Sequence, residues 1–103
     1  MTQPDQIEGI LIKTAEYFGI PRELLNKNYG NRSGIWKYKR YLIVILMDNF
    51  DMTFTQIGKL LNYKTPQNVS YSYHQLKNEL SDDFFGYEKV KKTYKRLIEY
   101  IGL

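Results

Sequence analysis

The sequence TFTQIGKLLNYKTPQNVSYSYHQLKNEL, residues 53–80, decides the fold expected of this chain. Thr53 and Gln56 match the Thr-x-x-Gln capping box, which marks the start of a helix. Apolar residues follow at helical spacing as far as Leu61, so a short helix with one apolar face is expected. Residues 62–64 then form a polar, basic turn before a second helix.

The second helix of this segment has a capped start and two unlike faces. Thr65 is an N-cap residue, and Pro66 occupies the first helical position, where a missing N–H costs nothing. Apolar side chains recur at steps of four, three and four, which indicates the side that packs on a core. They are Val69, Tyr73, Leu76 and Leu80. The other side is polar, contains no acid, and consists of Gln67, Asn68, Tyr71, His74, Gln75 and Asn78.

A short helix, a turn, and a second helix with polar, uncharged residues near its start form the layout of a helix-turn-helix. Glutamine and asparagine amides offer a donor beside an acceptor, which matches the N6/N7 edge of adenine in the major groove. Any surface helix also has a polar face. Residues 53–80 alone therefore leave DNA contact and simple solvation open.

The composition indicates a single soluble domain over residues 1–103. Hydrophobic residues make up 43% of the chain, which suffices for one core, and there is no cysteine for disulfides or thiolate metal sites. The N-terminus lacks the pattern of a signal peptide, and the longest apolar run, residues 41–47, is too short to cross a bilayer. We therefore expect a cytoplasmic protein with no membrane partner, located at the nucleoid if it binds DNA.

Positive charge is concentrated before and at the start of the second helix. The net charge is +4, but residues 27–64 hold seven bases and two acids, so this window carries +5 and the remainder −1. A localised basic patch is typical of polyanion-binding surfaces. Chance clustering on a solvated surface is the alternative.

The rest of the chain is expected to be helical, which makes the fold all-α: a compact domain of five to six helices. The additional helices are predicted at residues 4–18, 21–25, 35–49 and 87–101. Gly19 ends the first. Residues 41–47 are apolar on every side, so the third should lie in the centre of the domain. Its β-branched residues could also form a strand, but no partner strand is apparent.

The central helix also has a basic first turn, where Lys37, Lys39 and Arg40 are expected to face solvent. Cations at a helix N-terminus oppose the helix dipole, and an anionic ligand would relieve that repulsion. The alternative is that these charges cap the exposed end of a core helix. The C-terminal packing helix, 87–101, has bases on its outer face that we expect to be solvated, partly offset by Glu88 and Glu99.

The chain resembles the C-terminal DNA-binding domain (domain IV) of the bacterial replication initiator DnaA, a Trp-repressor-like helix-turn-helix, over about residues 7–100. The similarity is carried by AEYFGI and ELL near the start, by KYKR before the buried helix, and by TFTQIGKLL and KTPQNVSYSYHQL. Residues 37–76 can be laid on the family pattern without a gap. Ile57 and Gly58 occupy the family's Ile-Gly, and Val69 its valine.

The resemblance implies DNA binding, with a changed target. Lys37 and Lys39 fall where the family has basic residues that grip the backbone and reach the minor groove, and Lys64 falls on the arginine that opens its recognition turn. The family signature Asp-His-Thr-Thr is absent. The same places hold Thr65, Pro66, Gln67 and Asn68. The chain also has no Gly-x-x-x-x-Gly-Lys loop, so no nucleotide is expected to bind.

We therefore expect sequence-specific binding of double-stranded DNA in replication or transcription control. The expected phosphate-binding residues are Lys37, Lys39, Arg40, Lys64 and Thr65. The expected base-contacting residues are Gln67, Asn68 and Tyr71, with Arg32 a candidate for the minor groove. Homodimerisation stays open, because no feature of the sequence indicates it.

Three other functions compete with DNA binding: catalysis, protein–protein adaptation and RNA binding. Catalysis is not indicated: His74 has no acid at a helical spacing of three or four, and no metal cluster or nucleophile motif appears, so no enzyme, metal or cofactor is expected. A protein–protein adaptor is the main alternative, because ten tyrosines and one tryptophan suit an interface. Phe84 and Phe85 could be a docking knob, although such aromatics more often belong to a core. RNA binding is the third alternative, because a basic patch suits RNA as well as DNA.

Overall fold

The computed structural model describes residues 3–26, 34–82 and 86–103, and within those ranges the chain is all-helical, with no strand. The helices are α1 (Gln3–Phe18), the 3-10 helix η1 (Arg22–Asn26), α2 (Trp36–Phe50), α3 (Phe54–Leu61), α4 (Pro66–Ser81) and α5 (Glu88–Ile101). The all-α prediction is confirmed. Phe84 and Phe85, the predicted docking knob, lie outside the described residues.

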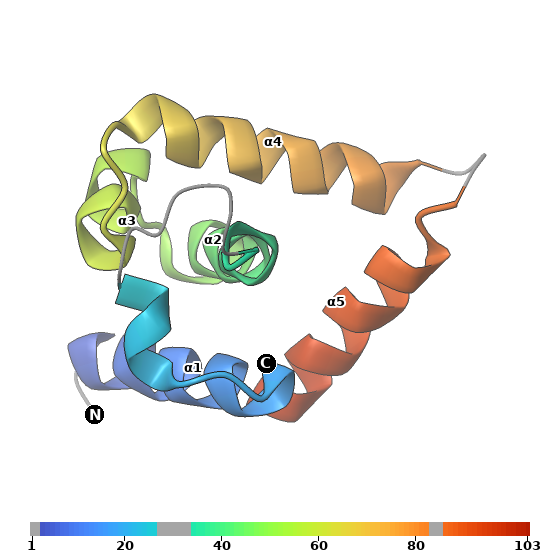
Figure 1. The fold of residues 1–103 in the computed structure, drawn as a ribbon, viewed down its shortest axis with the longest axis horizontal. Coiled ribbons are helices and arrows are strands. Elements are labelled where there is room, and N and C mark those ends of the chain that lie inside the picture. Colours follow the sequence, from blue (N-terminus) through green and yellow to red (C-terminus); the bar gives the residue numbers. More distant parts are fainter. Residues whose placement is uncertain (1–2, 27–33, 83–85) are drawn as a thin grey trace.

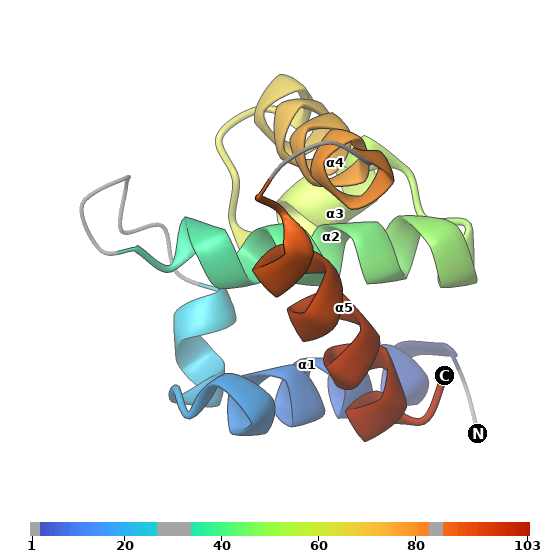
Figure 2. The same ribbon diagram turned by 90° about the vertical axis from the view of Figure 1, so that its right-hand side faces the viewer.

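The helices surround α2, which runs through the middle of the molecule. In Figure 1, α2 is seen nearly end-on, with α4 across the top, α1 along the bottom and α3 at the left. Figure 2, turned by 90°, again places α2 between α4 and α1, and shows α5 crossing from the α4 side to the α1 side. One face of α4 is therefore directed away from the rest of the fold.

The core lies on α2 because its sequence is apolar all round. Every residue from Tyr41 to Leu46 is buried, and residues 42–46 are fully inaccessible to solvent. A helix that is apolar on all sides gains stability only when other helices cover every side of it. Leu11, Leu61 and Leu76 are also fully buried, from α1, α3 and α4 respectively. The predicted burial of 41–47 is confirmed except at Met47, which is half-buried.

The starts of α3 and α4 follow from their caps. Gln56 N donates to Thr53 Oγ1 at 3.1 Å, while Thr53 N donates to Gln56 Oε1 at 2.9 Å, so the predicted capping box is formed. Thr65 caps α4 by accepting from Asn68 N, and Pro66 begins the helix as predicted. Two polar residues in the sequence thus determine where both helices begin.

Helices from the two ends of the chain pack together. Leu97 of α5 is fully buried, and Tyr100 Oη donates to Glu16 Oε2 of α1 at 3.1 Å. The rings of Tyr17 and Tyr100 meet edge to face, 5.6 Å between centroids. This contact closes the fold around α2. Among the described helices, none is both long enough and apolar enough to span a lipid bilayer.

Candidate functional site

The outward face of α4 carries a line of polar side chains. Val69 and Leu76 of α4 are fully buried, which confirms the predicted core side, with Tyr73 and Leu80 half-buried beside them. Opposite them, the steps of four, three and four residues follow one line along the helix axis. The residues of this line, here called the outer stripe, are Gln67, Tyr71, His74 and Asn78, and all are exposed.

The flanks of the outer stripe are polar as well. Asn68 is exposed and Gln75 is half-buried. Tyr71 is 70% exposed, the most of the large hydrophobic residues described as exposed. Residues 66–78 contain no acid, and the first acid of α4, Glu79, is engaged by Arg40. The outward face therefore has no negative charge that would repel an anionic partner.

Exposed bases lie in the turn before α4 and on α3. Lys64 and Thr65 are exposed directly before the first residue of α4, and Lys59 is exposed on the side of α3 away from the core. Thr65 Oγ1 accepts a hydrogen bond from Asn68 N at 3.3 Å, which leaves the hydroxyl hydrogen available for an acceptor outside the molecule. Lys59 was not among the predicted site residues, and only its position on the outer side of α3 indicates it.

The turn between α3 and α4 is held by side chains from elsewhere in the chain. The last carbonyls of a helix have no partner within the helix. Here the Lys39 amine donates to the carbonyl of Leu61 at 3.0 Å, and the Asn26 amide donates to that of Leu60. Backbone N–H of Tyr63 supplies a third bond, to the carbonyl of Gly58 at 2.8 Å. These contacts fix the angle at which α4 leaves α3.

The expectation that Lys39 faces solvent is wrong. The residue is only 5% exposed, and its ammonium group lies 5.2 Å from the centre of the Tyr63 ring. Because a cation is favoured at a helix C-terminus, the amine stabilises the end of α3 and is not available to bind an external anion. Burial lowers the pKa of Lys39 to about 8, because desolvation disfavours the charged form.

Arg40 is likewise not an exposed base, so that expectation is also wrong. Its guanidinium donates to Glu79 Oε2 at 2.7 Å, and the side chains of the pair are 10% and 14% exposed. The guanidinium also lies over the rings of Trp36 and Tyr41, 5.8 and 5.5 Å from their centres. Arg40 therefore joins α2 to the C-terminal half of α4, and it is unsuited to binding a phosphate.

Lys37 remains exposed, but it lies apart from the α3–α4 turn. Its amine lies 6.0 Å from the centre of the Trp36 ring. Lys37 and Lys39 are separated by about 200° around the helix, so Lys37 points away from the turn that Lys39 contacts. It points instead to the Arg40 side of α2. Arg32, the predicted minor-groove residue, lies outside the described residues.

The structure thus places five of the predicted site residues on one exposed surface, and it buries two others inside the fold. Those brought together, at the turn and on the first turns of α4, are Lys64, Thr65, Gln67, Asn68 and Tyr71. Lys39 and Arg40 are structural. The exposed face also includes His74 and Asn78, which the sequence pattern had placed on this polar side but which were not among the predicted DNA-contacting residues.

A second polar cluster fastens α4 to α2. Asp48 of α2 accepts from Tyr73 Oη at 2.8 Å and from the Lys77 amine at 2.9 Å. The hydrogen bond to Asp48 raises the pKa of Tyr73, because the carboxylate favours the protonated phenol. Lys77, the base within α4, is therefore already paired.

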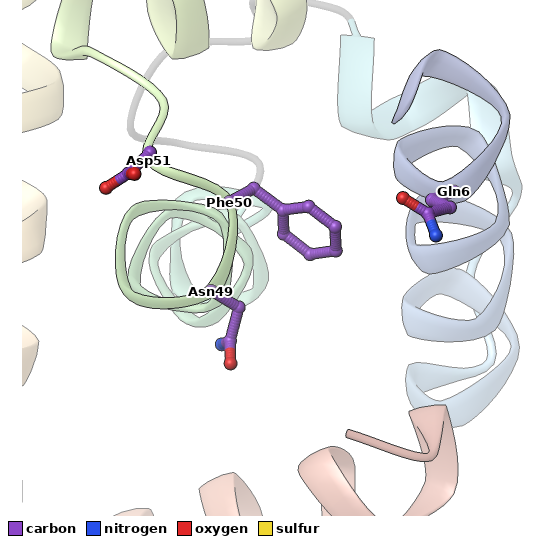
Figure 3. A pocket seen from close by; sticks show the side chains of 4 residues that line it. All are labelled: Gln6, Asn49, Phe50 and Asp51. Atoms are coloured by element: carbon purple, nitrogen blue, oxygen red, sulfur yellow. The ribbon is translucent and has the colours of Figure 1, made fainter. Parts of the chain in front are cut away.

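A shallow, open hollow of about 520 Å³ lies between α1 and the end of α2. It is lined by Gln6, Asn49, Phe50 and Asp51. In Figure 3 the Phe50 ring points from α2 toward α1, while the Asp51 carboxylate lies on the far side of α2 from Gln6. The polar groups of this hollow do not converge on one point, as the groups of a reaction site would have to.

Within residues 3–26, 34–82 and 86–103, no group of three or more histidine, cysteine, aspartate or glutamate side chains is placed to hold a metal ion. No family model matches the chain, and neither the curated proteins nor the solved structures give a match. The residues of the α4 face and the α3–α4 turn therefore carry the functional argument.

Proposed function

We propose that this protein binds double-stranded DNA with α3, the turn and α4 acting as a helix-turn-helix. In this proposal α4 is the recognition helix, whose first turns enter the major groove, and α3 crosses the backbone. The protein would act as a sequence-specific DNA-binding domain similar to domain IV of DnaA, at the nucleoid, in replication or transcription control.

The observation that carries the proposal is the outward face of α4. Its exposed side chains are amides, a tyrosine and a histidine, and its charged residues are turned to other partners. A helix face that only needs solvation is usually rich in Lys and Glu, whereas a helix in the major groove needs hydrogen-bonding groups at base edges. Because the face is directed away from α2, a duplex could approach it without displacing any other helix.

The proposed roles differ from those expected from the sequence at two residues. Lys64, with Lys59 on α3, would neutralise phosphates, and the Thr65 hydroxyl would donate to a phosphate oxygen. Gln67, Asn68 and Tyr71 would contact bases. Lys37 would contribute only through the field of its charge, and Lys39 and Arg40 not at all.

Fluorescence anisotropy with a labelled duplex across a range of salt concentrations tests the proposal. Neutralising one phosphate contact should reduce the slope of log K against log salt by about 1, so Lys64→Gln should reduce it by that amount. Lys92→Gln, the same charge change at an exposed position of α5, is the matched control and should leave the slope unchanged. Absence of salt-dependent binding, or equal slopes for both variants, would contradict the proposal.

A protein–protein adaptor is the second candidate, favoured by the exposed apolar side chains. Ile12 is 41% exposed, Tyr100 47% and Leu103 49%, on α1 and at the end of the chain. Tyr71, at 70%, would also suit an interface. If this alternative holds, Ile12→Ala impairs capture of a protein partner and DNA binding is absent at every salt concentration.

A further inference from the structure

We infer that the α4 face selects A·T base pairs and discriminates against G·C pairs in the major groove. The inference rests on the proposed function, because it concerns which sequence the same face accepts. Two observations support it. The side chains of Gln67, Asn68 and Tyr71 of α4 are exposed, and the charged side chains of α4 are paired with residues of α2.

The side chains that are free to reach bases include the partners of adenine. Gln67 and Asn68 are both exposed at the start of α4, and neither amide is engaged by another described side chain. Adenine presents N7 as an acceptor beside the N6 amino donor, and a glutamine or asparagine amide can pair with both at once. Two adjacent amides therefore provide two adenine-specific contacts.

Within α4 itself, the side chains that could pair with guanine or cytosine are bound to α2. Guanine presents two acceptors, O6 and N7, and is selected by arginine or lysine, while the cytosine amino group is selected by a carboxylate. The lysine within α4, Lys77, donates to Asp48 at 2.9 Å. Its glutamate, Glu79, accepts from Arg40 at 2.7 Å. Both charged groups of the helix are thus turned toward α2 and away from the outer stripe.

Tyr71 adds a contact that suits thymine. It follows Gln67 by one helical turn on the outer stripe and is 70% exposed. The ring offers an apolar surface for the thymine methyl group, which cytosine lacks. Gln67 and Tyr71 are about 6 Å apart along the helix axis, which is roughly two base-pair steps. The expected target therefore contains A·T pairs about two base-pair steps apart.

Three duplexes of equal length, with cores of A·T, G·C or inosine·cytosine pairs, separate the possible origins of such a preference. An inosine·cytosine pair resembles A·T in the minor groove and G·C in the major groove. Anisotropy titrations should therefore place its affinity with that of the G·C duplex. If the inosine·cytosine duplex binds as tightly as A·T, the preference arises in the minor groove and the inference is wrong.

Substitutions in α4 and in α1 then test whether the preference for A·T pairs comes from α4. Gln67→Ala should lose about five- to 150-fold in affinity for the A·T duplex, the range expected for one bidentate contact, and much less for the G·C duplex. Gln6→Ala removes an exposed amide from α1 and should change neither affinity. Equal affinity of the unaltered protein for all three duplexes would overturn this inference and leave DNA binding intact. Absence of binding to every duplex would overturn the proposed function itself.

Discussion

Lys39 and Lys64 are both lysines that lie next to the α3–α4 turn, but Lys39 is buried and Lys64 is exposed to solvent. The Lys39 amine is inside the fold, bound to the carbonyl of Leu61, whereas Lys64 is exposed in front of α4. The first stabilises the end of α3, and the second is available to an external anion. The role of a basic residue near the start of α4 therefore cannot be assigned from its charge alone.

Lys39 should make the stability of the fold depend on pH. The folded-state pKa is about 8 and the ordinary value is 10.5, so between those values the unfolded chain binds more protons than the folded one. Stability should consequently rise with pH in this range. From pH 7 to about 9.5 we expect a gain of about 1–2 kcal/mol, allowing for partial solvent screening.

Urea unfolding of the unaltered protein and of Lys39→Met at several pH values measures this gain. The variant should lose the gain attributed to Lys39, so the difference between the two proteins should change with pH. Tyrosines with a raised pKa, such as Tyr63, ionise above their usual range and so outside this interval. Parallel curves for the two proteins would show that Lys39 is not desolvated.

The pair of Arg40 and Glu79 should contribute far more to stability than the pair of Lys77 and Asp48. Removing one partner of a buried ion pair leaves an uncompensated charge, so Glu79→Gln should cost about 3 kcal/mol. Lys77 and Asp48 have side chains 45% and 29% exposed, and Lys77→Met should cost less than about 1 kcal/mol. Thermal or urea denaturation compares the two variants. Similar losses would mean that Arg40 is effectively solvated.

The sequence could not separate Lys37 from Lys39 and Arg40, and the reason is geometric. All three lie in the first two turns of α2, and the helical pattern shows only that they point in different directions. Which directions are covered depends on where α3 and α4 pack, and that depends on long-range contacts with Leu61 and Glu79. The burial of Lys39 and Arg40 is therefore a tertiary property.

At the scale of the element, α3 and α4 approach each other at Gly58. A methyl group added there would lie 3.5 Å from Val69 Cγ2 and 3.9 Å from Tyr63 Cβ, which is ordinary van der Waals contact. Gly58→Ala should therefore be tolerated and can stabilise α3 by up to about 1 kcal/mol through helix propensity. Gly58→Leu would overfill the contact and should cost about 1–3 kcal/mol. Melting temperatures of both variants check the prediction, and a large loss with alanine would contradict it.

The elements themselves were predictable because their signals are local. Thr53, Gln56 and Thr65 form the caps that their spacing predicts, and Pro66 begins α4. The predicted starts and ends of the longer helices agree with the structure to within about two residues, as is usual for helix termini. The support of the α3–α4 turn by Asn26 and Lys39 was not predictable, since those residues are 34 and 22 positions from their carbonyl partners.

At the scale of the whole molecule, the packing of α5 on α1 should make unfolding cooperative. Leu97 is fully buried, so Leu97→Ala should lower the free energy of unfolding by about 2–5 kcal/mol. Trp36, the single tryptophan, reports on α2, while far-ultraviolet circular dichroism reports on all helices. Both signals should shift together in denaturant. If the Trp36 transition stays in place, α5 and α1 form a separate unit, and the prediction of one domain is wrong.

The distribution of charge over the molecule is the property that the sequence predicted least well. Residues 27–64 carry an excess of five positive charges, but the charged groups of Lys39 and Arg40 are buried inside the fold. Among the described bases of that window, the exposed ones are Lys37, Lys59 and Lys64. The field that a polyanion would meet is therefore weaker than the sequence suggests, and more of any discrimination must come from hydrogen bonds at the α4 face.

Three side chains of the outer stripe, those of Gln67, Tyr71 and Asn78, contribute little to the stability of the fold, whereas the His74 ring contacts Phe54 and Tyr73. The side chains of Gln67, Tyr71 and Asn78 make no hydrogen bond or ring contact with another side chain in the described part of the chain. Caps, buried leucines and the Arg40–Glu79 pair keep α4 in place without them. A library randomised at these three positions should yield mostly folded members. If the proposed function holds, such a library could give the domain a new DNA target while keeping its stability.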